Sequence, residues 1–203
     1  MTNLELPILY SFRRCPYAMR ARMAIVRSGQ ICEHREVILR ERPEHMMEIS
    51  PKGTVPVLLL PSGEVIEESL EIMQHVLSWR LSDIEALWVE RNDNQFKFHL
   101  DRYKYPNRFE GIDHIEQRTL AKDYLDELDV LLSSEISDAL SDALFPFVRQ
   151  FANHDRIWFD SQNWDNIHVW LSDNLASEEF SICMKKYPQW QVGDELVKFP
   201  STE

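Results

Sequence analysis

Residues 6–18 read LPILYSFRRCPYA, a stretch that places a cysteine where a strand should end and a helix should begin. Leu6–Tyr10 is a short apolar run, which is typical of a buried strand. Pro16 suits the first position of a helix, because its missing N–H is not needed there. Small and apolar residues then recur at helical spacing until Gly29, a predicted stop. Cys15 is therefore predicted to lie at a helix N-terminus.

This position favours the thiolate form of the Cys15 side chain. Helix N-termini stabilise negative charge and lower the pKa of cysteine from about 8.5 to roughly 3.5–7.5. Arg13, Arg14 and Arg20 add positive charge to the same turn. Ala18 stands where a dithiol redox protein has its second cysteine, so a catalytic cycle at Cys15 needs an external thiol. A buried cysteine that only packs is the alternative, and the strand–Cys–Pro–helix context favours function over it.

The sequence after this helix predicts the remaining strands of a small α/β domain. His34–Leu39 reads as a second strand, and Glu41–Ile49 as a loop with a short helical turn. Pro56 begins an apolar strand, because proline is tolerated at the first residue of a strand. The residues alone leave both the cis and the trans form of the bond before Pro56 possible. A turn at 61–64 then leads into a short strand at Val65–Ile66.

A further helix is predicted over 70–77, directly after Glu67, Glu68 and Ser69. Ser69 is predicted as its N-cap, because a serine hydroxyl accepts from the first unpaired N–H groups of a helix. The same hydroxyl and N–H groups could also hold a carboxylate, as helix N-termini readily do.

Residues 7–77 resemble the thioredoxin-like domain of a glutathione transferase, and 9–18 resemble the omega class most closely. Members of that class use a cysteine where most transferases use tyrosine or serine. The resemblance therefore implies that Cys15 is the catalytic nucleophile. It also implies a glutathione site whose residues are Tyr17, Arg42, Val55, Pro56, Glu68 and Ser69.

The resemblance implies a role for several of these residues. Pro56 would be the cis-proline, and Val55 would pair its backbone with the cysteinyl unit of glutathione. Glu68 and Ser69 would hold the γ-glutamyl group. Arg42 would lie where a basic residue meets the glycyl carboxylate.

The sequence after a linker at about 78–84 reads as helices throughout. We therefore expect two domains: a thioredoxin-like α/β domain over 1–77 and an all-α helical bundle over 85–203, the glutathione transferase fold. Ser82 is a predicted cap of the first helix after the linker. Leu140–Ala152 is more apolar than a surface helix and is predicted to be the central helix, with Asp138 as its cap.

The helical domain should supply the pocket for a second substrate. Tyr103 and Lys104 lie in a stretch rich in aromatic and basic residues, and the resemblance implies that this helix faces the catalytic turn. Either residue is thus a candidate for substrate contact. Packing of the aromatic residues between two helices is an alternative of equal weight.

Composition excludes several other functions. The sequence has no apolar run that approaches the roughly 20 residues needed to span a membrane, and its N-terminus does not read as a secretory signal. Three cysteines are too few for a disulfide framework and predict a reducing, cytoplasmic location; Cys32 and Cys183 are predicted to be inert. The scattered histidines predict no metal site, and the five glycines form no phosphate-binding loop.

The net charge of −12 is unevenly distributed along the chain. Residues 1–77 contain 9 basic and 10 acidic residues, whereas 78–203 contain 13 and 24. An acidic half repels polyphosphate, so nucleic acid is not an expected partner. The near-neutral half, with its arginines around Cys15, suits a small anionic ligand such as glutathione.

These observations predict a glutathione-dependent thiol transferase in which Cys15 forms a mixed disulfide with glutathione. Glutathione is the predicted co-substrate, together with a small electrophilic or disulfide substrate, and the family resemblance implies a homodimer. One alternative is a conjugating glutathione transferase that uses the hydroxyl of Tyr10 or Ser11. Another is a non-enzymatic regulatory protein on the same fold, such as the stringent starvation proteins.

Overall fold

The computed structural model describes residues 5–201, which divide into two compact units. The first unit combines the N-terminal residues up to Arg80 with Ser177–Glu203, and the second is Leu81–Ala176. The expected combination of an α/β unit and a helical unit is confirmed. The expected domain bounds of 1–77 and 85–203 stay a prediction.

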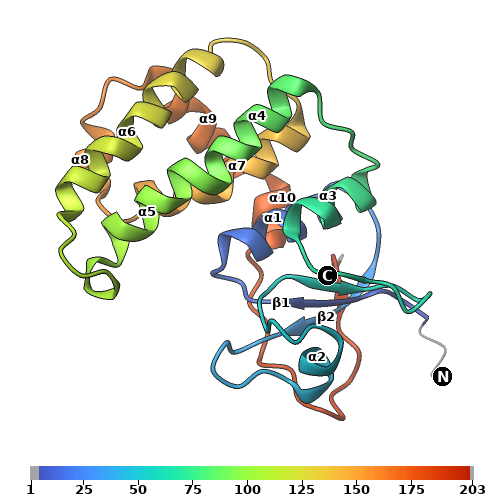
Figure 1. Cartoon of the computed structure of the whole chain (residues 1–203). Coiled ribbons are helices and arrows are strands. Elements are labelled where there is room, and N and C mark those ends of the chain that lie inside the picture. The colour runs from blue at the N-terminus through green and yellow to red at the C-terminus, as the bar shows by residue number, and fades with distance from the viewer. Residues whose placement is uncertain (1–4, 202–203) are drawn as a thin grey trace. The chain divides into compact units, whose positions relative to one another are not determined.

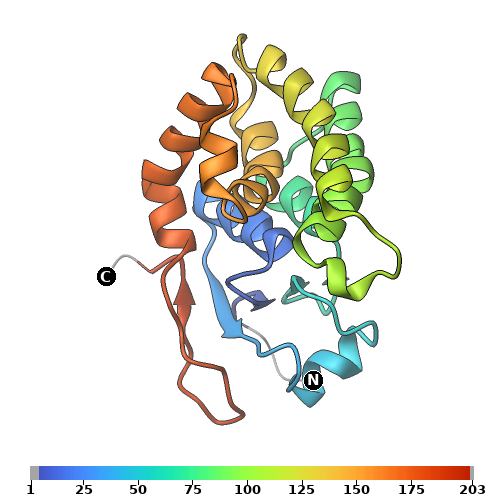
Figure 2. The same cartoon turned by 90° about the vertical axis from the view of Figure 1, so that its left-hand side faces the viewer.

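The first unit is built on a five-stranded sheet with the strand order β4-β3-β1-β2-β5. β1 runs parallel to β2 and antiparallel to β3, and β5 pairs antiparallel with the free edge of β2. Figure 2 shows β5, in red, beside the light-blue β2. The strands are β1 (Ile8–Ser11), β2 (Cys32–Glu36), β3 (Val57–Leu59), β4 (Val65–Ile66) and β5 (Lys198–Phe199).

Four helices belong to this sheet. Figure 1 shows α1, α3 and α10 on one side of it and α2 on the other, and α1 packs against both α3 and α10. The apolar residues of β1 and β3 are buried, because one core lies on each face of the sheet. The helices are α1 (Pro16–Ser28), α2 (Glu44–Ile49), α3 (Ser69–Leu77) and α10 (Glu178–Cys183).

Most local predictions for this unit are confirmed. Pro16 is the first residue of α1, and Gly29 ends the helix with a φ of 69°, a conformation that favours glycine. The Val55–Pro56 bond is cis. Ser69 was predicted as the cap of α3 and this is wrong: Glu68, with its extended backbone, is the cap residue, and Ser69 is the first helical residue.

The second unit consists of helices in the described part of the chain. α4 (Asp83–Arg91), a π-helical turn (Asn92–Phe96) and α5 (Lys97–Lys104) follow one another without a break, and a 3₁₀ turn (Pro106–Arg108) ends the segment. They are followed by α6 (His114–Leu131), α7 (Asp138–Ala152), α8 (Arg156–Asp160) and α9 (Asp165–Ala176).

The expected central helix is α7, whose apolar residues are almost all buried. Ser82 caps α4 as predicted, through a reciprocal bond with Glu85. The prediction that Asp138 caps α7 is wrong. Ser137 takes that position because its backbone is extended, and its hydroxyl accepts from the N–H of Leu140 at 3.1 Å.

Candidate active site around Cys15

Cys15 lies at the junction between β1 and α1, in the capping position of the helix. Its backbone is extended, its N–H donates to the carbonyl of Phe12 at 3.0 Å, and its own carbonyl accepts from Met19 at 2.9 Å. The turn 12–15 is thus closed by a hydrogen bond before the helix starts. The Cys15 side chain is only partly buried, so its sulfur is accessible from outside the core.

The sulfur of Cys15 lies beside the loop that carries the cis-proline. Its Sγ is 3.7 Å from the carbonyl oxygen of Val55, the residue that precedes Pro56. Both Val55 and Pro56 are buried, so they form a fixed wall. The structure therefore brings together three of the predicted site residues from segments that are 40 positions apart.

Arg20 links the start of α1 to the start of α3. Its side chain is fully buried, and Nη1 donates to the hydroxyl of Ser69 at 3.4 Å. The same guanidinium lies 5.8 Å from the centre of the Tyr17 ring. Tyr17 and Ser69, both predicted glutathione contacts, are in this way connected through one buried cation.

The loop before the cis-proline is anchored by Arg42. The Arg42 Nε donates to the carbonyl of Gly53. Gly53 has a φ of 62°, and a Cβ there would lie 3.0 Å from the Arg42 side chain, so only glycine fits. In the same loop Lys52 forms an ion pair with Glu68, whose side chain is 64% exposed. Glu68 thus presents its carboxylate at the surface, next to a cation.

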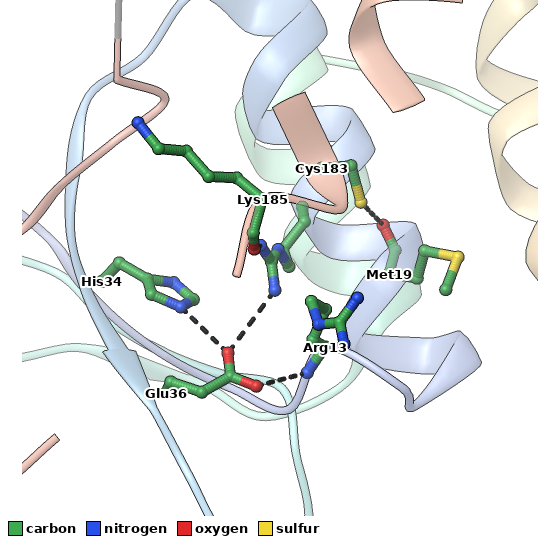
Figure 3. A network of polar contacts seen from close by, with 7 residues as sticks. Arg13, Met19, His34, Glu36, Cys183 and Lys185 are labelled. Atoms are coloured by element: carbon green, nitrogen blue, oxygen red, sulfur yellow. Dashed lines mark hydrogen bonds and ion pairs between the residues drawn. The ribbon is translucent and has the colours of Figure 1, made fainter. Parts of the chain in front are cut away.

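Behind the turn that carries Cys15 lies a network of buried charges that the sequence did not reveal (Figure 3). The Glu36 Oε1 accepts from the backbone N–H of Arg13 at 2.8 Å. Its other oxygen, Oε2, lies 3.1 Å from the His34 Nε2 and 3.5 Å from the Arg22 Nη1. Burial is the main reason that the pKa of His34 is below its ordinary value. The sequence did contain one signal for this network. His34 and Glu36 lie two positions apart on β2, so their side chains lie on the same face of the sheet.

The first unit is similar in sequence to a known protein family. Residues 9–80 match the family described as Glutathione S-transferase, N-terminal domain. This part of the chain is therefore similar to the N-terminal domain of glutathione S-transferases. It contains the Cys15 turn, the cis-proline loop and the start of α3.

Individual glutathione transferases are similar to this chain over short stretches of sequence. A probable glutathione transferase of Aplysia californica is 42% identical over 55 residues, which are 27% of this chain and 60% of that protein. Glutathione S-transferase omega-1 of Mus musculus is 37% identical over 62 residues, which are 30% of this chain and 26% of that protein. The chain thus matches less than two thirds of either relative.

A solved structure extends the likeness over the helical unit. It is a glutathione transferase family member from Pseudomonas fluorescens Pf-5 with two glutathione bound, with a TM-score of 0.75 and 17% identity. The aligned region covers 89% of this chain and 92% of the Pseudomonas chain. The chain therefore has the glutathione transferase fold, with a thioredoxin-like sheet followed by helices.

The hydroxyls of Tyr10 and Ser11, which the conjugating alternative would use, are both buried. The Tyr10 side chain is fully buried, and its hydroxyl accepts from Arg35 at 2.6 Å and bonds to the His45 Nδ1 at 2.6 Å. Burial raises the pKa of Tyr10, although the neighbouring Arg35 opposes the shift. Ser11 is also fully buried, and its hydroxyl has no hydrogen-bond partner within residues 5–201.

The two candidate residues for the second substrate lie on α5. Tyr103 is buried, and its ring packs 5.3 Å from Phe151 and 4.5 Å from His154, centre to centre. Burial raises the pKa of Tyr103. Lys104 lies 5.2 Å from the centre of the Tyr105 ring. Tyr103 thus takes part in the packing that was the alternative, and substrate contact by either residue stays a prediction.

The other two cysteines, Cys32 and Cys183, are buried. The Cys32 thiol donates to the carbonyl of Phe199 at 3.4 Å, and the Cys183 thiol to that of Met19 at 3.6 Å. Burial raises the pKa of Cys32 to about 12. Within residues 5–201, no group of His, Cys, Asp or Glu could hold a metal ion, and no helix is long and apolar enough to cross a membrane.

Proposed function

We propose that the protein is a glutathione-dependent thiol transferase with Cys15 as its nucleophile. The observation that carries this proposal is the position of the Cys15 thiol: it lies at the N-terminus of α1, partly accessible, beside the carbonyl of Val55. Helix N-termini favour thiolate, which is the form that attacks disulfides. The burial of Cys32 and Cys183 leaves Cys15 as the accessible thiol among the described residues.

The reaction takes two exchange steps. In the first, the Cys15 thiolate attacks the glutathionyl sulfur of a mixed disulfide. A Cys15–glutathione disulfide forms, and the other thiol leaves with the electron pair of the broken S–S bond and takes up a proton. In the second, the thiolate of a free glutathione attacks the glutathionyl sulfur on Cys15. This releases oxidised glutathione and restores the Cys15 thiolate.

Glutathione binding in this proposal uses the residues around the sulfur. Val55 pairs with the cysteinyl unit, and Glu68 and Ser69 hold the γ-glutamyl group. The buried contact between Arg20 and Ser69 supports this role, because it fixes the hydroxyl at the start of α3. Pro56, Tyr17 and Arg42 complete the set. The same chemistry would allow dehydroascorbate-type reduction.

We also propose an assembly and a location for the protein. The family resemblance supports a homodimer. Three cysteines that form no disulfide support a reducing, cytoplasmic location.

The test is intact mass spectrometry after incubation with oxidised glutathione, with wild type, Cys15→Ala and Cys32→Ala in parallel. We expect one glutathione on wild type and on Cys32→Ala, none on Cys15→Ala, and loss of the adduct on addition of reduced glutathione. An adduct that persists in Cys15→Ala would overturn the assignment of the nucleophile. No adduct on any variant would reject disulfide exchange and favour a non-enzymatic role for the fold.

A further inference from the structure

A hollow of about 290 Å³ lies on the first unit, on the side of the turn that carries Cys15 away from the cis-proline loop. Its wall includes Phe12, Arg13 and Arg14 from the turn, Glu36 at the end of β2, and Lys186 and Tyr187 from the C-terminal segment. We call it the Arg13–Lys186 hollow. Its volume is near the lower end of ligand sites, which is about 300–1,000 Å³, so it suits a small molecule.

Positive charge dominates this wall. Arg13, Arg14 and Lys186 have no carboxylate partner within residues 5–201. Acidic residues outnumber basic ones by 34 to 22 in the chain, so three unpaired cations around one hollow are unusual for this protein. Cations held close together repel one another, and a bound anion would remove that repulsion.

The one acidic residue of the wall, Glu36, does not neutralise these cations. Its two oxygens are occupied by the Arg13 N–H, by His34 and by Arg22, a fully buried cation behind the hollow (Figure 3). The Glu36 charge is therefore balanced by Arg22. It does not neutralise the positive charges of Arg13, Arg14 and Lys186.

Tyr187 also lines the hollow. Its ring is fixed by His34, at 4.5 Å between ring centres, and by Phe199 at 6.4 Å. Its hydroxyl is buried and has no hydrogen-bond partner in the described part of the chain. Because solvent does not reach this hydroxyl, Tyr187 contributes a fixed ring to the wall and no hydrogen bond to a ligand.

We propose that the Arg13–Lys186 hollow is a binding site for a small organic anion with two or more negative charges, carboxylate or phosphate. Arg13, Arg14 and Lys186 supply the charge, and the fixed ring of Tyr187 forms part of the wall. The proposal does not depend on the reaction of Cys15, and it holds whether or not the protein is an active transferase.

The test is calorimetric titration of the full-length protein at low ionic strength, with citrate as the carboxylate probe. Wild type is compared with Lys186→Glu and with Lys198→Glu, an exposed lysine of the same segment outside this hollow. We expect one citrate site in wild type, affinity about tenfold lower in Lys186→Glu, and affinity within about twofold of wild type in Lys198→Glu.

Three results would overturn the site: no citrate binding by wild type, unchanged binding by Lys186→Glu, or an equal loss in Lys198→Glu, which would mean a general charge effect. A parallel titration with inorganic phosphate identifies the source of the negative charge. Tighter phosphate binding that is lost in Lys186→Glu assigns the site to a phosphate-bearing ligand, and tighter citrate binding assigns it to a carboxylate. Affinity should fall as salt is added, because the contributing charges are near the surface.

Discussion

At the scale of single residues, the surroundings of a thiol determine what it can do. Cys15 and Cys32 flank α1 in sequence, and neither forms a disulfide. Cys15 caps a helix and is partly accessible, whereas Cys32 is buried in β2 and donates to a carbonyl of β5. Burial raises the pKa of Cys32 to about 12, although the nearby Arg22 opposes the shift, so this thiol stays protonated at neutral pH.

Glu36 accepts from the backbone of the turn that carries Cys15, and its charge balances the buried Arg22. Glu36→Gln keeps an acceptor for the Arg13 N–H but leaves the Arg22 guanidinium without its counter-charge. We expect the free energy of unfolding to fall by about 3 kcal/mol, because removal of one partner leaves a buried charge uncompensated. Urea unfolding measures this loss. Glu41→Gln removes an exposed ion pair and should cost under about 1 kcal/mol. Equal losses would mean that Glu36 is not a buried counter-charge.

His34 makes the stability of the fold depend on pH. Burial lowers its pKa in the folded state, so below about 6.5 the unfolded chain binds a proton that the folded chain does not. Its contribution to stability is thus present at neutral pH and is lost as pH falls below about 6.5. The slope is up to about 1.4 kcal/mol per pH unit.

Urea unfolding of wild type and His34→Gln between pH 7.5 and 5 tests this linkage. We expect the variant to lose less stability than wild type over that range. His75→Gln, at an exposed position, is the control and should follow wild type. Parallel curves for wild type and His34→Gln would contradict the linkage.

At the scale of elements, local signals predicted β1, α1 and the cis-proline loop, because each depends on residues that are neighbours in sequence. β5 could not be predicted in this way: Lys198–Phe199 is too short for a periodic pattern, and its partner in β2 lies more than 160 positions away. The ion pair between Glu36 and Arg22 could not be predicted either, because only the packing of α1 on the sheet brings Arg22 to β2. The cap of α3 was misplaced by one residue because the backbone, and not the hydroxyl, determines which residue is the cap.

β5 seals the edge of the sheet over Cys32. Phe199 is fully buried against His34 and Arg22, so Phe199→Ala should leave a cavity and cost about 3 kcal/mol. The same change should expose Cys32 to thiol reagents in the native state, which peptide mapping after alkylation would detect. Val192→Ala, at a residue that is 88% exposed, should change neither quantity. An unreactive Cys32 in Phe199→Ala would mean that β5 is not what protects it.

At the scale of the whole molecule, the two compact units differ in net charge. Leu81–Ala176 has 19 acidic and 9 basic residues, a net charge of −10, whereas the rest of the chain has 15 and 13, a net charge of −2. The acidic charge is thus concentrated in the helical unit. The unit that carries Cys15 is close to neutral, which leaves its arginines able to attract a small anion.

The chain leaves the first unit near Arg80 and returns to it at Ser177. The return segment supplies α10, which packs on α1, and β5, which covers the edge of β2. A fragment of residues 1–80 contains the whole matched family region but lacks both elements, so we expect it to show no cooperative thermal transition by circular dichroism. Addition of a peptide of residues 177–203 should restore one, whereas a peptide of the same composition in scrambled order should not. If the fragment alone unfolds cooperatively at the temperature of the full chain, the first unit does not need the C-terminal segment to fold. If the peptide restores the cooperative transition, the segment is an integral part of the unit that holds Cys15.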